Sequence, residues 1–171
     1  MTTHQVVSNE QWLAQRKALL DKEKAFTKLR DELSAERRDL PWVRVGKNYM
    51  FDSDRGKVSL ADLFDGKSQL IVYHFMFHPD WDAGCKSCSY WADNYERVVV
   101  HLQARDTNLV VVSRAALRKL EDFKRRMGWT FKWVSSLESD FNTDFNVTFT
   151  QEQIAAGDGH IFHHEIVSGT K

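Results

Sequence analysis

The chain contains two cysteines, Cys85 and Cys88, and they form a C-x-x-C motif. An apolar run at residues 70–77, rich in β-branched and aromatic side chains, predicts a buried strand just before the motif. Residues 85–105 show the spacing of apolar side chains that is typical of a helix. Unpaired N–H groups and the macrodipole favour a thiolate at a helix N-terminus and lower the pKa of a cysteine there. The placement therefore predicts thiol redox chemistry.

We assign different roles to the two thiols. In such motifs the first cysteine is exposed and attacks, so Cys85 is predicted to be the nucleophile. Cys88 lies one helical turn later and is predicted to resolve the mixed disulfide that Cys85 forms. A positive charge next to the thiolate and aromatic walls that limit water access are expected to support the pair. The supporting residues that we predict are Lys86, Trp81, Trp91 and His78.

The same motif also permits a zinc site, because C-x-x-C supplies half of a four-ligand centre. A second cysteine pair is missing from the sequence, so the remaining ligands would have to be histidines. Candidates lie close to the motif and near the end of the chain: His74, His78, His160, His163 and His164. A third possibility is that both cysteines are buried and inert.

Length, composition and charge are those of an ordinary soluble protein. A chain of 171 residues can form one domain with a substantial core. The 24 basic and 24 acidic residues give a net charge of zero, which argues against a nucleic-acid-binding protein. We see neither an apolar run that could span a bilayer nor a secretory signal. We therefore expect a cytoplasmic protein, and in that reducing compartment a C-x-x-C is more often catalytic or metal-binding than structural.

The first part of the chain, residues 8–39, is predicted to be one long helix. Ser8 and Gln11 have the spacing of a capping box, and Pro41 ends the helix. Apolar residues recur every seven positions, but the companion positions of a coiled coil are polar. We expect this helix to pack on its own domain or on a partner subunit, and we predict a homodimer.

The rest of the chain alternates between predicted strands and helices. Strands are expected at residues 109–112 and 129–133, with a helix between them that Ser113 caps and Gly128 ends. Short helical segments are expected at 58–64, 139–145 and 151–156, and a last strand or tail at 160–167. This order indicates an α/β fold with a mostly parallel sheet, helices on both faces, and the C-x-x-C at the carboxyl end of a strand. The basic face of the 113–127 helix is either a solvated surface or a site for an anionic partner; its residues are Arg114, Arg118, Lys119, Lys124, Arg125 and Arg126.

Six segments, in their order and spacing, resemble a bacterial thioredoxin-like family catalogued as domain of unknown function 899. They are LPWVRVGKNYMF, VSLADLF, SQLIVYHFMFHPDW, GCKSCSYWADN, VVVSRAALRKLEDFKRRMGW and SSLESDFNTDF. Members are commonly labelled predicted dithiol-disulfide oxidoreductases. The resemblance implies a thioredoxin-like domain at residues 41–171, an added N-terminal helix at 1–40, and a redox role for Cys85 and Cys88.

The sequence departs from the thioredoxin pattern in two places. Its only prolines are Pro41 and Pro79, so the proline loop that thioredoxins present opposite the C-x-x-C cannot be present in its usual form. Family members usually continue beyond the point that corresponds to Lys171, so the C-terminal part of the sheet is expected to be incomplete.

The predicted function is thiol–disulfide exchange with a protein or small-molecule thiol or disulfide, or reduction of a peroxide, at Cys85 and Cys88. We expect no cofactor, no bound metal, no nucleic acid and no membrane partner. Two alternatives remain open, a zinc-binding module and a non-catalytic interaction domain of the same fold.

Overall fold

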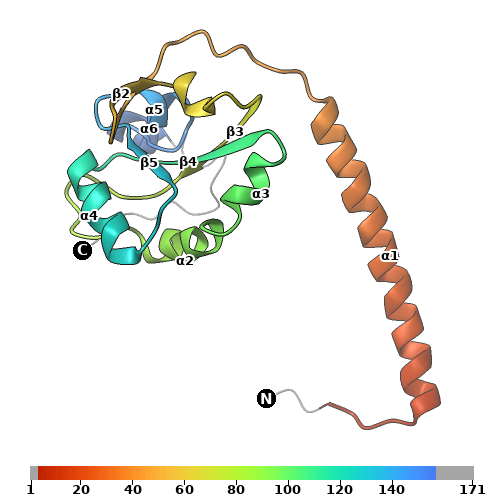
Figure 1. The fold of residues 1–171 in the computed structure, drawn as a ribbon. Coiled ribbons are helices and arrows are strands. Elements are labelled where there is room, and N and C mark those ends of the chain that lie inside the picture. Colours follow the sequence, from red (N-terminus) through yellow and green to blue (C-terminus); the bar gives the residue numbers. More distant parts are fainter. Residues whose placement is uncertain (1–3, 157–171) are drawn as a thin grey trace. The chain divides into compact units, whose positions relative to one another are not determined.

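The structure is a computed structural model that describes residues 4–156 (Figure 1). The chain divides into two units, Met1–Gly46 and Lys47–Lys171. The predicted strand or tail at residues 160–167 lies outside the described residues. No helix of the described part is long and apolar enough to cross a membrane.

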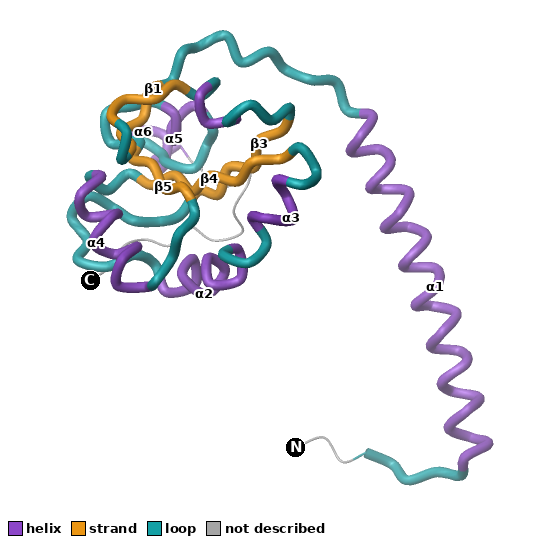
Figure 2. Tube along the Cα trace, in the orientation of Figure 1, coloured by secondary structure: helices purple, strands orange, loops and turns teal. Residues whose placement is uncertain are grey.

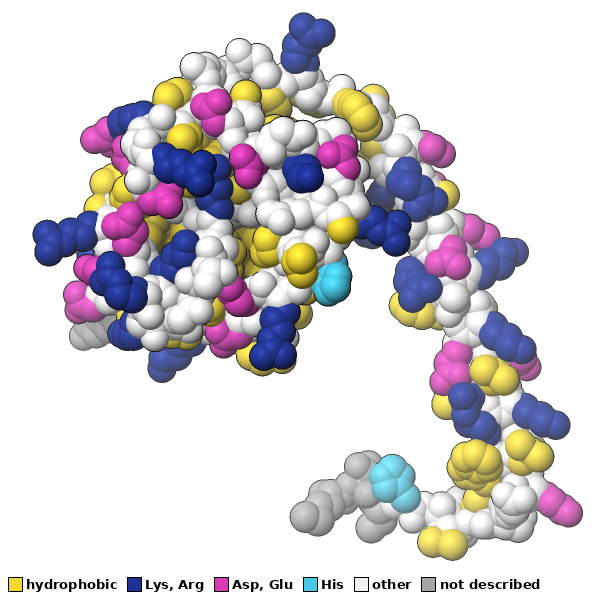
Figure 3. Space-filling model, in the orientation of Figure 1, with side chains coloured by type: hydrophobic (Ala, Val, Ile, Leu, Met, Phe, Trp, Pro, Cys, Tyr) yellow, Lys and Arg dark blue, Asp and Glu magenta, His cyan; other side chains and the backbone are white. Residues whose placement is uncertain are grey.

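The first unit contains one helix, α1 (Asn9–Asp39). The predicted capping box is present: Ser8 Oγ accepts from the Gln11 N–H at 3.2 Å, and Gln11 Oε1 accepts from the Ser8 N–H at 3.1 Å. The helix ends before Pro41, which cannot continue it. None of its residues is buried, and hydrophobic and charged side chains are interspersed along it (Figure 3). The homodimer stays a prediction.

The second unit is built on a five-stranded sheet in the order β2-β1-β5-β4-β3. The strands are β1 (Met50–Ser53), β2 (Gly56–Ser59), β3 (Gln69–His74), β4 (Thr107–Ser113) and β5 (Lys132–Ser135). Strands β3, β4 and β5 are parallel, and β1 pairs antiparallel with both β5 and β2. The predicted parallel pairing of the runs 70–77 and 109–112 is confirmed, with Tyr73 opposite Val111.

Helices cover both faces of the sheet, as predicted (Figure 2). One face carries α2 (Lys86–Tyr95), α3 (Val99–Gln103) and α4 (Leu117–Met127). The other face packs against a short 3-10 helix (Asp62–Phe64) and α5 (Phe141–Asp144), and α6 (Gln151–Ala156) follows. The prediction of a thioredoxin-like α/β fold with an added N-terminal helix is confirmed by this arrangement: a C-x-x-C opens the helix that links two parallel strands.

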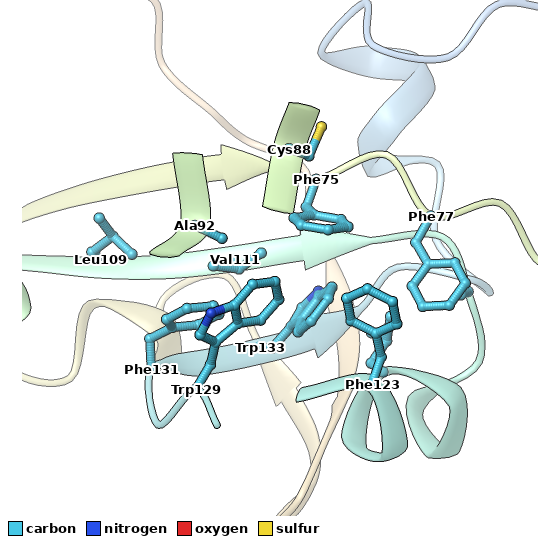
Figure 4. Close-up of a cluster of buried hydrophobic side chains, with 12 residues drawn as sticks. Phe75, Phe77, Cys88, Ala92, Leu109, Val111, Phe123, Trp129, Phe131 and Trp133 are labelled. Atoms are coloured by element: carbon cyan, nitrogen blue, oxygen red, sulfur yellow. The ribbon is translucent and has the colours of Figure 1, made fainter. Parts of the chain in front are cut away.

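The core consists of two apolar clusters that share β4 between them. Val110 and Val112 face the α5 side, while Leu109 and Val111 face α2 and α4. Because every residue of β4 is buried, its β-branched composition is explained by contact with both layers. The α2 side is dominated by aromatic rings around Phe75 (Figure 4). Full burial of one such apolar side chain stabilises the folded state by about 1.5–3 kcal/mol.

Three sequence-based predictions of local structure were wrong. The helix predicted over 85–105 is broken into α2 and α3 by a tight turn, in which the Val98 N–H donates to the Tyr95 carbonyl at 2.9 Å. Part of the 58–64 helix is instead the strand β2, which pairs with β1 along its length. Ser113 does not cap a helix: it is the last residue of β4, its hydroxyl donates to the Phe75 carbonyl at 2.7 Å, and α4 begins only at Leu117.

Candidate functional site

Cys85 lies at the N-cap of α2, where the sequence predicted it. After β3, the Phe75 N–H donates to the Val112 carbonyl at 2.9 Å, and this bond keeps the chain against β4. The loop then returns, and the Cys85 N–H donates to the Met76 carbonyl at 3.0 Å. The first turn of α2 contains no acidic residue, so no carboxylate in this turn opposes the positive end of the helix.

The two thiols are free and differ in exposure, as predicted: Cys85 is partly exposed and Cys88 is buried. Burial raises the pKa of the Cys88 thiol, and so does the adjacent Cys85 side chain. The backbone N–H of Met76 acts in the opposite direction and lowers this pKa. The pair therefore combines an accessible sulfur, that of Cys85, with a buried sulfur, that of Cys88, whose thiolate the Met76 N–H can stabilise.

Tyr73 is a contact of the pair that the sequence analysis missed. Its hydroxyl lies 3.2 Å from the Cys88 carbonyl oxygen, to which it donates, and its ring packs edge-on against Tyr95. Burial raises the pKa of Tyr73, so the hydroxyl stays protonated and remains a donor at neutral pH. A tyrosine in an alternating apolar strand gives no sequence signal for this role, since Tyr73 also fits a purely structural position in the core.

The loop between β3 and α2 is held by a side chain from α4. Lys119 Nζ donates to the Pro79 carbonyl at 2.6 Å and to the Trp81 carbonyl at 2.8 Å. Within the loop, the Trp81 N–H donates to the His78 carbonyl at 3.1 Å and closes a turn. Lys119 was placed on the basic face of a helix, and the structure shows that it anchors the loop that leads to Cys85.

A cavity of about 340 Å³ opens beside the cysteine pair at the carboxyl ends of β3 and β4. This is the edge at which open α/β sheets bind ligands. Its wall is mainly aromatic, with one thiol and a few polar groups. It is formed by Tyr73, His74, Phe75, Met76, Phe77, His78, Trp81, Cys88, Arg114, Asn142, Val147 and Thr148.

The structure brings some of the predicted supporting residues to this cavity and leaves others outside. His78 and Trp81 are part of the wall. Lys86 and Trp91 are exposed on α2 and do not line it. The inward positions of α2 are Cys88 and Ala92, four residues apart, so Trp91 points outward, where its ring packs against Tyr90.

Three polar residues of the wall were not predicted to support the cysteine pair, although His74 was named as a possible zinc ligand and Arg114 as part of a basic helix face. Arg114 follows the carboxyl end of β4, His74 ends β3, and Asn142 comes from α5. Burial lowers the pKa of His74, whose ring stacks on Phe141 with centroids 5.4 Å apart. The position of Arg114 directly after a buried parallel strand is the one signal that could have identified it from the sequence.

No group of three or more His, Cys, Asp or Glu side chains that could hold a metal ion is found within residues 4–156. His160, His163 and His164, named as possible zinc ligands, lie outside the described residues.

The comparisons place the chain in a family. A family model described as "Bacterial protein of unknown function (DUF899)" matches residues 1–171. The chain belongs to the DUF899 family. No curated protein matches the sequence.

Two solved structures are similar to it at low identity. A cysteine-to-serine mutant of PrxQ from Xylella fastidiosa is 18% identical, with a TM-score of 0.47 over 67% of this chain and 68% of that one. A "putative thiol-disulfide oxidoreductase" from Bacteroides vulgatus is 13% identical, with a TM-score of 0.46 over 61% of this chain and 70% of that one.

Proposed function

We propose that this DUF899 protein is a dithiol–disulfide oxidoreductase in which Cys85 attacks and Cys88 resolves. The observation that carries the proposal is the contact of a partly exposed thiol at the N-cap of α2 with a buried thiol one turn later. Cys85 lies at the positive end of a helix, and the two-residue spacing lets the second sulfur reach the first.

The reaction conserves atoms and electrons. The Cys85 thiolate attacks one sulfur of a disulfide RS–SR, forms a mixed disulfide and releases RS⁻, which takes up a proton. Cys88 then loses its proton and attacks the Cys85 sulfur, which forms the Cys85–Cys88 disulfide and releases the second RS⁻. Two electrons pass from the protein to the substrate. An external dithiol with a lower reduction potential than the Cys85–Cys88 pair returns two electrons to the protein.

The surroundings of Cys88 fit the second step. Two of the influences that raise its pKa, the charge of Cys85 and the hydrogen bond to it, are removed once Cys85 is in a mixed disulfide. The Met76 N–H still lowers the pKa of Cys88 in that state, while burial still raises it. The pKa of Cys88 is therefore expected to be lower in the mixed disulfide than in the reduced protein, which favours its attack in the second step.

The test is equilibration of the reduced protein with mixtures of glutathione and glutathione disulfide, followed by mass spectrometry of the intact chain. The wild type is expected to form the internal disulfide with a midpoint of about −220 to −320 mV, the range of cytosolic glutathione poise. Cys88→Ser is expected to accumulate one bound glutathione, whereas Cys85→Ser is expected to remain unmodified. If the wild type forms no internal disulfide at any ratio, the proposal is wrong.

A further inference from the structure

The cavity beside the cysteine pair has the size and character of a small-molecule site. Its volume of about 340 Å³ falls within the range of about 300–1,000 Å³ that ligand pockets occupy. Phe75, Phe77 and Trp81 give it apolar surface, and Cys88 forms part of the wall. Cys85 is not part of the wall, but it packs against the same core cluster as Cys88, so a molecule in the cavity lies next to the reactive pair.

The charge of the wall is positive. Arg114 is half-buried at the end of β4, and within residues 4–156 its guanidinium has neither an ion pair nor a hydrogen bond to a protein acceptor. The guanidinium keeps its charge throughout the physiological pH range. A guanidinium offers two parallel donors that match the two oxygens of a carboxylate.

Asn142 adds a second donor to the wall. Its side-chain oxygen accepts from Ser136 Oγ at 2.6 Å, which fixes the amide with its oxygen toward the protein. No acceptor for the amide NH₂ is present among the described residues, so this group remains available to a ligand. The carbonyl of Asn142 also accepts from the Val147 N–H at 2.9 Å and the Thr148 N–H at 3.1 Å, which holds this side of the cavity in place.

We propose that the cavity binds a low-molecular-weight disulfide that carries a carboxylate, with the carboxylate on Arg114 and the apolar body against the aromatic wall. This inference rests on the proposed function, because it names the substrate class of the same site. The step is the exchange described above: the substrate S–S bond breaks, the Cys85–Cys88 bond forms, and the substrate leaves as two thiols. A dithiol reductant then restores the protein.

Two aromatic disulfides that differ in charge provide the probes. 5,5′-Dithiobis(2-nitrobenzoate) carries carboxylates, whereas 4,4′-dithiodipyridine is uncharged near neutral pH, and each releases a product that is followed by its absorbance. Arg114→Gln is expected to lower the rate constant for the carboxylate probe about tenfold, equivalent to about 1.4 kcal/mol, and to leave that for the neutral probe nearly unchanged. Arg118→Gln, at an exposed position on α4, is the matched control and is expected to change neither.

The ratio of the two rate constants separates substrate recognition from effects on the thiols. An arginine that acted only by stabilising a thiolate would slow both probes equally when replaced, and that result would overturn the inference. An Arg114→Gln variant in which neither rate constant changes would overturn it as well. Arg114→Lys keeps the charge and loses the paired donors, so it is expected to lie between the wild type and Arg114→Gln.

A binding measurement distinguishes failure of this inference from failure of the proposed function. Benzoate carries the carboxylate without a disulfide, and its binding is followed by tryptophan fluorescence, with benzamide as the uncharged control. We expect benzoate to bind the wild type and not Arg114→Gln. If neither disulfide probe reacts faster than with a free thiol while benzoate binding still depends on Arg114, the oxidoreductase proposal fails. If benzoate does not bind but thiol exchange is normal, the carboxylate site is wrong and the oxidoreductase proposal stands.

Discussion

Gly84, directly before Cys85, lies against two aromatic rings and has no room for a side chain. A Cβ at this position would be 2.5 Å from Cε1 and 2.9 Å from Cζ of Phe75, and 3.3 Å from Cζ of Phe123. Phe75 cannot move aside without cost, because it is 2% exposed and its ring lies 4.7 Å from that of Trp133, measured between centroids. The Gly84→Ala substitution therefore overpacks the α2 side of the core.

Overpacking of this kind costs about 1–3 kcal/mol, and we expect Gly84→Ala to lower the free energy of unfolding by that amount. Urea denaturation followed by tryptophan fluorescence measures the change. Gly46→Ala is the control, since a Cβ there meets nothing within 4 Å. Its free energy of unfolding is expected to stay within about 0.5 kcal/mol of the wild type.

A double-mutant cycle identifies the ring that causes the effect. Phe75→Leu shortens the side chain that a Cβ on Gly84 would meet. The Gly84→Ala, Phe75→Leu double variant is therefore expected to be less destabilised than the sum of the two single variants. If Gly84→Ala proves as stable as the wild type, or if the two changes are simply additive, the packing argument is refuted.

Two further predictions concern the loop and the cavity. Lys119→Met removes the donor to the Pro79 and Trp81 carbonyls, so the Trp81 amide is expected to exchange its hydrogen faster; exchange at the wild-type rate would contradict this. Burial lowers the pKa of His74, so below about pH 6.5 the unfolded chain binds more protons than the folded one. The free energy of unfolding therefore decreases as the pH falls toward the folded-state pKa, by at most about 1.4 kcal/mol per pH unit. His74→Phe is expected to remove this slope from urea-denaturation curves, and an unchanged slope would exclude His74 as its source.

The features that the sequence predicted are set by local signals. The capping box of Ser8 and Gln11 needs only neighbouring residues, and the apolar runs of β3 and β4 need only their own composition. The same holds for Gly128, which ends α4 with a φ of 74° that favours glycine. The position of Cys85 at a helix start follows from the strand before it and the helical spacing after it.

The features that were missed depend on contacts between distant segments. Ser113 has the right residue type for a cap, but its hydroxyl is used by Phe75 and Trp133 inside the core. Arg114 was assigned to a helix face, yet it lies in the loop before α4 because α4 begins later than the spacing indicated. The wall of the cavity is assembled from β3 and the loop after it, α2, the loop after β4, and α5 with the loop after it, so its composition cannot be read from any one stretch.

The central claim is that Cys85 is the attacking thiol and Cys88 the shielded one. The most direct measurement is the site of alkylation by iodoacetamide near neutral pH, determined by peptide mass spectrometry of the reduced wild type, Cys85→Ser and Cys88→Ser. Because Cys88 is 7% exposed and burial raises its pKa, modification is expected at Cys85 in the wild type and in Cys88→Ser, and at neither position in Cys85→Ser. Alkylation that persists in Cys85→Ser and disappears in Cys88→Ser would contradict the assignment and reverse the two roles.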